Sequence, residues 1–128
     1  MIRAQTILKV VDNSGGKTAK CIKVKGKSGK AAAHLGDIVI VSIQSLRKRY
    51  RSQVRVRVNK SEVHHGVIVQ TRRFHRHLDG RAIYFGSNSV VIITPKSKVL
   101  GTRISTFIPR GLRGLKWAKL GTLAKGFI

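Results

Sequence analysis

The chain has 128 residues, the usual size of one domain, which argues against a two-domain enzyme with an interdomain cleft. A hydrophobic share of 41% is enough for a folded core. Lys and Arg number 27 against 4 Asp and Glu, which gives a net charge of +23 at pH 7. Such a chain repels itself unless a polyanion neutralises it, so composition favours a nucleic-acid partner over an anionic membrane surface.

Acidic residues and cysteine are too few for most catalytic or metal chemistry. General acid–base catalysis needs positioned carboxylates, and the sequence offers only Asp12, Asp37, Glu62 and Asp79. The single cysteine, Cys21, excludes an intramolecular disulfide and a cysteine-based zinc cluster, and its alternating surroundings predict a small buried residue. No run approaches the roughly 18 apolar residues of a membrane span. We therefore expect no enzyme activity, cofactor, metal or membrane association.

Period-two alternation dominates the N-terminal third and predicts β-strands. Residues 6–11 and 18–25 are predicted strands that meet across the turn cluster at residues 12–16. Asn13 and Ser14 in that cluster could bond neighbouring backbone amides, so the loop is a structural turn, an RNA contact, or both. A turn at Gly36–Asp37 precedes a buried strand at residues 38–43.

The rest of the chain continues as strands until a short helical tail. The strands predicted here cover residues 53–59, 63–71, 81–85 and 90–93. The first of them alternates Val and Arg, which gives one apolar and one cationic face. Asp79–Gly80 is a hairpin signature. Helix-like spacing occurs only from about residue 110 to 124, where three glycines keep the helices short.

Many short strands with Gly-rich turns predict an all-β fold with a small helical tail, built as a closed or nearly closed antiparallel β-barrel. We find no internal repeat and no linker. The sequence is therefore interpreted as one domain over residues 1–128, with a barrel to about residue 103 and a tail over about residues 104–128.

Basic residues are so poorly matched by acids that a merely solvated charged face does not explain them. Lysines dominate residues 9–30 and arginines dominate residues 47–81, and arginine can both fork onto phosphate and stack on bases. The candidate RNA-binding residues are Lys17, Lys20, Lys23, Lys25, Lys27, Lys30, Arg47, Lys48, Arg49, Arg51, Arg55, Arg57, Arg72, Arg73, Arg76 and Arg81.

Histidines and aromatic residues are further candidates for ligand contacts. The pairs His64–His65 and His75–x–His77 lie among basic residues with no thiolate nearby in sequence, which favours surface histidines over a metal site. The aromatic residues are too scattered for a base-stacking platform, and only Tyr50 and Phe74 are candidates to stack on a base.

Five motifs carry a family resemblance over essentially the whole chain. They are Asp12–Asn13–Ser14–Gly15, Cys21–Ile22–Lys23–Val24, Gly36–Asp37–Ile38, Asp79–Gly80 and Gly101–Thr102–Arg103–Ile104. Their order and approximate spacing resemble the universal fourteenth protein of the large ribosomal subunit. Residues 87–91 and 104–112 are more similar to the mitochondrial branch of that family than to the bacterial one.

The resemblance implies a five-stranded β-barrel with a projecting β-ribbon and short C-terminal helices, without enzyme activity. It also implies binding to large-subunit rRNA at the intersubunit face, beside large-subunit protein nineteen and across from small-subunit rRNA. A ribosome-silencing factor would dock at Thr102, Arg103 and Lys119. The expected location is a ribosome, in the mitochondrial matrix rather than in bacterial cytoplasm or a plastid.

Residues 47–62 depart from the family pattern. The stretch from residue 47 to 58 is longer than in bacterial relatives, and its Val/Arg alternation predicts a β-ribbon over residues 47–60 that extends from the barrel. Leu78 also stands where a proline often precedes Asp–Gly. Two other function classes stay open at this point. One is a free-standing basic barrel that acts as a nucleic-acid chaperone or nucleoid protein, and the other is a nuclease, which needs clustered acids or histidines.

Overall fold

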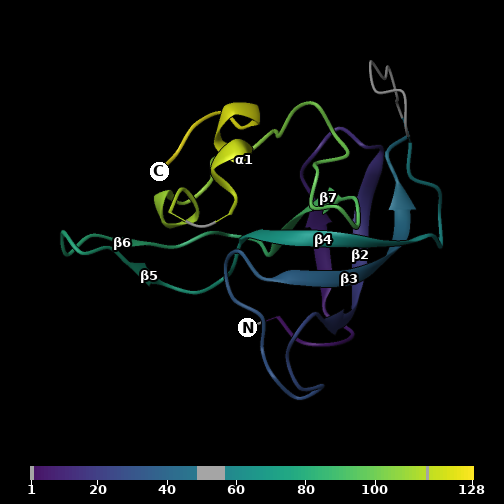
Figure 1. Ribbon diagram of the computed structural model, residues 1–128, viewed down its shortest axis with the longest axis horizontal. Coiled ribbons are helices and arrows are strands. Elements are labelled where there is room, and N and C mark those ends of the chain that lie inside the picture. Colours follow the sequence, from purple (N-terminus) through teal and green to yellow (C-terminus); the bar gives the residue numbers. More distant parts are fainter. Residues whose placement is uncertain (1, 49–56, 115) are drawn as a thin grey trace.

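A computed structural model describes residues 2–48, 57–114 and 116–128 (Figure 1). A closed barrel is formed, in spatial order, by β1 (Ile7–Val10), β2 (Gly16–Val24), β3 (Ile38–Leu46), β4 (Val63–Gln70) and β7 (Ser89–Ile93). A separate two-stranded ribbon pairs β5 (His75–Arg76) with β6 (Ala82–Ile83), and it extends away from the barrel in Figure 1. The tail carries a 3-10 turn, η1 (Arg110–Leu112), and one helix, α1 (Ala118–Leu123). The predicted all-β barrel with a small helical tail is confirmed.

The seam that closes the barrel differs from the antiparallel prediction. Neighbouring strands pair antiparallel from β1 through β4 to β7, but β7 pairs with β1 in parallel, with Lys9 opposite Ser89 and Val10 opposite Val90. The prediction of a fully antiparallel barrel is therefore wrong at this one pairing. The reason is the strand count: when each strand reverses the direction of the one before it, the first and fifth run the same way.

Strand alternation fills the barrel interior with aliphatic side chains. Leu8 and Val10 of β1, Cys21 of β2, Val41 of β3 and Ile92 of β7 are all fully buried there. The predicted buried cysteine is confirmed, and burial raises the pKa of its thiol. Each fully buried aliphatic side chain of this kind stabilises the fold by about 1.5–3 kcal/mol.

A second apolar layer lies between the outside of the barrel and the tail. Val67 and Val69 of β4 and Val91 and Ile93 of β7 point away from the interior and pack with tail residues. Their tail partners are Ile104, Ile108, Leu112, Trp117 and Leu120. Because the tail covers the outer face, both faces of β7 and of the second half of β4 are buried. This explains why residues 67–69 and 90–93 are continuous apolar runs rather than an alternation.

The three predicted turns, at residues 12–16, 36–37 and 79–80, are confirmed. Gly15, Gly36 and Gly80 have φ angles of 103°, 82° and 82°, a region that favours glycine. The His77 amide donates to the Arg81 carbonyl over 2.8 Å, which closes the β5–β6 ribbon at Asp79–Gly80. The ribbon that the structure describes is therefore at residues 75–83.

The ribbon predicted over residues 47–60, and the strand predicted at 53–59, lie mostly outside the described residues. Their described parts, residues 47–48 and 57–60, are not in strands. Val58 is buried in the barrel core, with its amide donating to the Ser14 carbonyl over 3.2 Å, so this valine of the alternation packs on the barrel.

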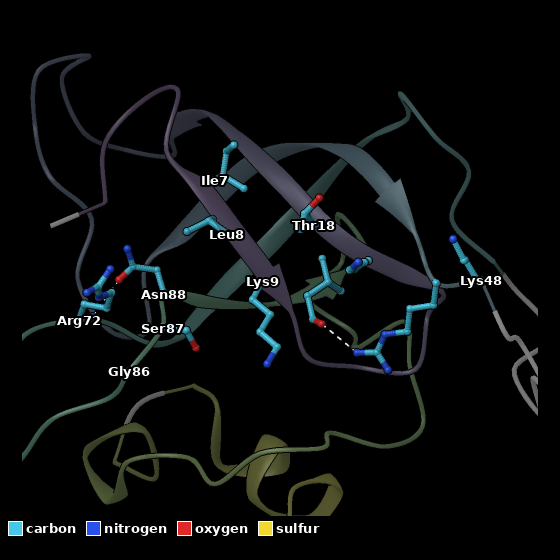
Figure 2. Close-up of a pocket in the computed structure, with 12 residues that line it drawn as sticks. Ile7, Leu8, Lys9, Thr18, Lys48, Arg72, Gly86, Ser87 and Asn88 are labelled. Atoms are coloured by element: carbon cyan, nitrogen blue, oxygen red, sulfur yellow. Dashed lines mark hydrogen bonds between the residues drawn. The ribbon is translucent and has the colours of Figure 1, made fainter.

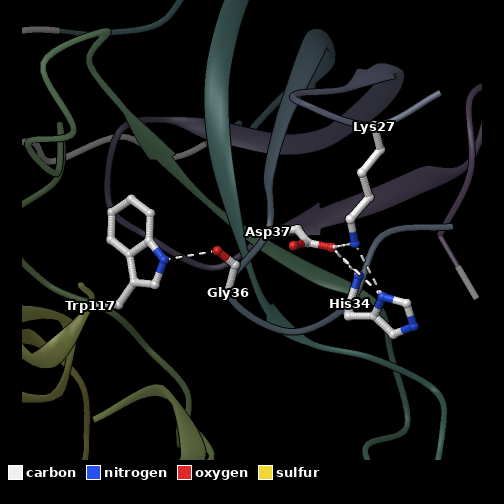
Figure 3. Close-up of polar contacts among 5 residues, drawn as sticks. All are labelled: Lys27, His34, Gly36, Asp37 and Trp117. Atoms are coloured by element: carbon white, nitrogen blue, oxygen red, sulfur yellow. Dashed lines mark hydrogen bonds and ion pairs between the residues drawn. The ribbon is translucent and has the colours of Figure 1, made fainter. Parts of the chain in front are cut away.

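The tail is fastened to the barrel through Trp117. Its indole N–H donates to the carbonyl of Gly36, in the turn that precedes β3, over 2.8 Å (Figure 3). A bridge between Ile108 and Phe127 closes the tail on itself. In the part of the chain that the structure describes, no helix is long and apolar enough to cross a membrane.

Candidate nucleic-acid interface

A pocket of about 800 Å³ opens on the outside of the barrel beside β1 (Figure 2). Five cationic residues line it: Lys9, Lys17, Arg47, Lys48 and Arg72. In the view of Figure 2, Arg72 and Lys48 lie toward opposite ends with Lys9 between them. None of the described residues that line the pocket is acidic. The cations therefore gather without an acid among the described lining residues, and such a surface attracts a polyanion.

Two of the lining arginines are held by the barrel itself. The Arg47 guanidinium donates to the Val10 carbonyl over 3.0 Å, and its own amide donates to the Gly15 carbonyl over 3.0 Å. The amide of Arg72 donates to Asn88 Oδ1 over 2.8 Å, which ties the end of β4 to the start of β7. The Arg47 side chain and the backbone of Arg72 are therefore already ordered, so less conformational entropy is lost at these groups when a ligand binds.

The pocket also has an apolar wall. Ile7 lies on the outward face of β1 and is 64% exposed, although large aliphatic side chains on strands are normally buried. Polar groups of Thr18, Ser87 and Asn88 surround the same space. The pocket thus combines positive charge, hydrogen-bonding groups and an exposed apolar surface.

Four of the sequence-predicted RNA-binding residues are brought together here: Lys17, Arg47, Lys48 and Arg72. Lys9 belongs with them but was missing from the predicted set. Its alternation with the buried Leu8 and Val10 could have placed it on the outer face.

The other predicted residues lie elsewhere. Lys23, Lys25 and Lys30 are exposed on β2 and in the loop that follows it, Lys20 is half-buried on β2, and Arg57, Arg73 and Arg76 are exposed. Arg49, Arg51, Arg55 and the candidate stacking residue Tyr50 lie outside the described residues. Phe74, the other stacking candidate, is 69% exposed and contacts Tyr84 with ring centroids 5.1 Å apart.

Two predicted cations already have acidic partners within the chain. Lys27 Nζ lies 2.5 Å from Asp37 Oδ2, which also accepts from the His34 amide over 2.7 Å (Figure 3). Arg81 pairs with Asp79 in the hairpin, and this pairing raises the pKa of Arg81 and lowers that of Asp79. Lys27 and Arg81 are therefore weaker candidates for phosphate contacts than the cations of the pocket.

The turn after β1 serves as an internal hydrogen-bonding centre. Asp12 is buried, and its carboxylate accepts from the Ser14 amide and hydroxyl and from the Ile92 amide of β7. Burial raises the pKa of Asp12, while these hydrogen bonds and the nearby Arg47 oppose the rise. The acid therefore joins the two strands of the parallel seam and has no exposed catalytic position.

Asn13 joins this turn to a segment near the end of the chain. Its Oδ1 accepts from the amides of Thr102 and Arg103 over 2.8 and 3.2 Å, and its Nδ2 donates to Thr102 Oγ1 over 2.9 Å. Gly101 fits against the turn, because a Cβ there would lie 2.7 Å from Asn13 Oδ1. We call Asp12–Ser14 together with Gly101–Arg103 the clasp. It favours the structural reading of the turn cluster.

The predicted docking residues are distributed over two neighbouring features. Thr102 and Arg103 are exposed on the clasp. Lys119 lies on α1 and lines a second pocket of about 680 Å³ with three more lysines, Lys96, Lys98 and Lys116. The Ile104 amide donates to the Leu123 carbonyl over 2.8 Å, which links the residue after Arg103 to the end of α1.

Two of the described histidines, His64 and His75, each bond to a protein side chain. His64 Nε2 lies 2.9 Å from Glu62, whose pKa is lowered to about 2, chiefly by hydrogen bonds from the amide and side chain of Asn59. His75 bonds Thr71 Oγ1 over 2.6 Å, and its pKa is lowered by burial and by nearby Arg73 and histidines. Among the described residues, no group of three or more His, Cys, Asp or Glu could hold a metal ion.

A comparison with protein families gives one match over the entire chain. Residues 1–128 match the family described as ribosomal protein L14p/L23e. The match agrees with the barrel, with the five motifs in register and with the excess of basic residues. The chain therefore belongs to the ribosomal protein L14p/L23e family, whose members are structural proteins of the large ribosomal subunit rather than enzymes.

Proposed function

We propose that the protein binds large-subunit rRNA through the pocket beside β1, at the face of the subunit that meets the small subunit. The observation that carries this proposal is the row of five cations without an acid among the described lining residues. Lys27 and Arg81 are paired with acids elsewhere, so these two cations are less available to an external polyanion than those of the pocket.

The binding is electrostatic in the first instance. Each phosphate that a cation neutralises releases counterions and contributes a slope of about −0.7 to −0.9 to the dependence of log affinity on log salt. Five such contacts give a slope of roughly −3.5 to −4.5 for the pocket alone. Binding to rRNA also relieves the self-repulsion that a net charge of +23 creates within the chain, which favours the assembled state.

Sedimentation through a sucrose gradient tests the proposal. The protein should travel with large subunits at a salt concentration that removes loosely bound basic proteins. The double variant Lys9→Ala/Arg72→Ala should be lost from that fraction at lower salt than the matched double variant Lys23→Ala/Lys30→Ala, whose cations are exposed but outside the pocket. A protein that sediments with any RNA and never with subunits would instead be a free-standing basic barrel.

A second proposed role is the docking of a ribosome-silencing factor at Thr102, Arg103 and Lys119. Support comes from the clasp, which holds the backbone of Thr102 and Arg103 in one conformation, and from the three other lysines that line a pocket with Lys119. A prearranged and basic rim of this kind suits a partner protein with an acidic surface. We also propose protein nineteen and small-subunit rRNA as neighbours, and the mitochondrial ribosome as the location.

Charge reversal tests the docking proposal. Arg103→Glu and Lys119→Glu should each weaken factor binding at least tenfold while sedimentation with the large subunit is retained, since rim charges tune association more than fold. Lys23→Glu, on the exposed face of β2, is the control. Unchanged factor binding in both variants would rule out this surface. Fractionation of cells into mitochondria and cytosol tests the location separately.

A further inference from the structure

The pocket beside β1 has features that a purely phosphate-binding surface does not need. Phosphate contacts require cations and amides, but this pocket also exposes most of Ile7 to solvent and surrounds it with hydroxyl and amide groups. Paired RNA presents its phosphates and sugars outward and keeps its bases stacked inside the helix. A paired helix would therefore neutralise the cations and leave the apolar wall without a partner.

We propose that this pocket holds one unpaired nucleotide of the rRNA, with the base against Ile7 and the flanking phosphates on Lys9, Arg72 and Lys48. This inference rests on the proposed function, because it specifies the RNA element that the same pocket takes. The volume of about 800 Å³ is in the range of ligand pockets, which runs to roughly 1,000 Å³. In the view of Figure 2, Arg72, Lys9 and Lys48 follow one another across the pocket, so phosphates on both sides of an inserted base would each meet a cation.

Hydrogen-bonding groups at the ends of the pocket are suited to a base edge. Asn88 Oδ1 accepts from the Arg72 amide, which fixes the plane of the Asn88 amide and directs its NH₂ group. Ser87 Oγ lies 3.2 Å from Ser89 Oγ, and Thr18 Oγ1 lies 2.5 Å from Ser45 Oγ, so two hydroxyl pairs are already oriented. Unpaired bases are recognised through such groups together with a planar or apolar contact surface.

The fixed guanidinium of Arg47 supplies that planar surface. It is held by the Val10 carbonyl at the edge of the pocket, and guanidinium planes are stacking partners for splayed bases. A base that packs on Ile7 would cover the apolar area that solvent now contacts, and Arg47 lines the same pocket as a second contact surface. Lys23 on β2 and Lys25 and Lys30 in the loop that follows it are exposed cations that do not line the pocket, so they lack this combination.

Two RNA hairpins test the inference with the full-length protein. One has a fully paired stem, and the other has the same stem and the same loop but carries a single bulged 2-aminopurine, a fluorescent adenine analogue, in the stem. Wild-type protein should bind the bulged hairpin roughly tenfold more tightly by fluorescence anisotropy, and the emission of the bulged base should change on binding.

Ile7→Ser should reduce this preference to less than about threefold while affinity for the paired hairpin is unchanged. Ile22→Ser is the matched control, because Ile22 is also exposed, at 46%, on the adjacent strand but does not line the pocket. Its bulge preference should equal that of the wild type. Circular dichroism spectra and melting temperatures of both variants verify that they fold.

Three results would overturn the inference: equal wild-type affinity for the two hairpins, an unchanged emission of the bulged base, or a full preference in Ile7→Ser. In each case a salt-dependent affinity for both hairpins would leave the proposed rRNA binding intact. If the protein binds neither hairpin, or if its affinity does not fall as salt rises, the proposed function itself is contradicted. The failure of the inference and the failure of the proposed function are therefore distinguishable.

Discussion

The clasp and the pocket beside β1 differ in how far their polar and charged groups find partners within the chain. In the clasp, Asp12 and Asn13 direct their polar atoms to protein partners, from Ser14 and Ile92 to Thr102 and Arg103. In the pocket, five cations have no acid among the described lining residues. Polar groups that are satisfied within the chain stabilise the fold, whereas charges left unmatched are available to a partner. Substitutions in the clasp should therefore affect stability, and those in the pocket should affect binding.

The largest effect is expected where the clasp holds the barrel seam. Asp12→Ala removes the acceptor for the Ser14 amide and hydroxyl and the Ile92 amide, all buried. We expect a loss of roughly 2–4 kcal/mol in the free energy of unfolding. Urea denaturation measures it. Asp79→Ala, which removes an exposed hairpin acid, should stay within about 0.5 kcal/mol of the wild type. Equal losses in the two variants would contradict the distinction.

A single methyl group in the clasp should have the next largest effect. In Gly101→Ala the new Cβ would lie 2.7 Å from Asn13 Oδ1 and 3.1 Å from Asp12 Cβ. The turn must shift, which should cost about 1–3 kcal/mol. Gly111→Ala is the control, because a Cβ there meets nothing within 4 Å, and it should be neutral or slightly stabilising. Melting temperatures of the two variants give the comparison.

Substitutions in the pocket should affect RNA binding and leave stability nearly unchanged. Arg72→Ala should leave the melting temperature nearly unchanged and should make the salt slope for RNA binding less negative by about 0.7–0.9, the value for one phosphate. Arg81→Ala should change the slope less, because Arg81 is already paired with Asp79. Filter binding of rRNA fragments at several salt concentrations measures both. A larger slope change in Arg81→Ala would place the RNA on the ribbon instead.

The smallest effect concerns the pKa values of Asp12 and Glu62. An aspartate ordinarily has a lower pKa than a glutamate, and here we expect the opposite order. Asp12 is buried and has a pKa above 3.8, whereas hydrogen bonds hold the pKa of Glu62 at about 2. The lowered pKa of Glu62 stabilises the folded state above pH 4.5, and this contribution is lost as pH falls from 4.5 toward 2. Carbon-13 NMR of the side-chain carboxyls should show Asp12 titrating first as pH falls. Glu62 titrating above Asp12 would contradict both environments.

Much of the barrel follows from residue patterns, because alternation and turn residues act locally. The turns at Gly15 and Gly80 and the buried Cys21 were predicted and are confirmed. The parallel seam was missed, although five strands that reverse in turn require it. Pairing between the first and last strands is a long-range feature, so no local pattern of residues 7–10 points to Ser89.

The candidate site was less predictable for the same reason. Composition identified Lys17, Arg47 and Arg72 as RNA-binding candidates among sixteen, but their meeting in one pocket depends on strand order. Lys27 was indistinguishable from them in sequence until the structure showed Asp37 beside it. The clasp was equally hidden, since both of its segments carry family motifs but lie 89 residues apart.

The bond between Asp12 and Ile92 sets the time at which the protein can fold during its synthesis. These residues are 80 positions apart, so β1 leaves the translating ribosome long before the strand that closes the barrel exists. Trp117, which fastens the tail to Gly36, comes later still. The nascent chain therefore carries its basic segments in an open form until synthesis is nearly finished. Chains that terminate before Ser89 should be degraded instead of accumulating as folded protein.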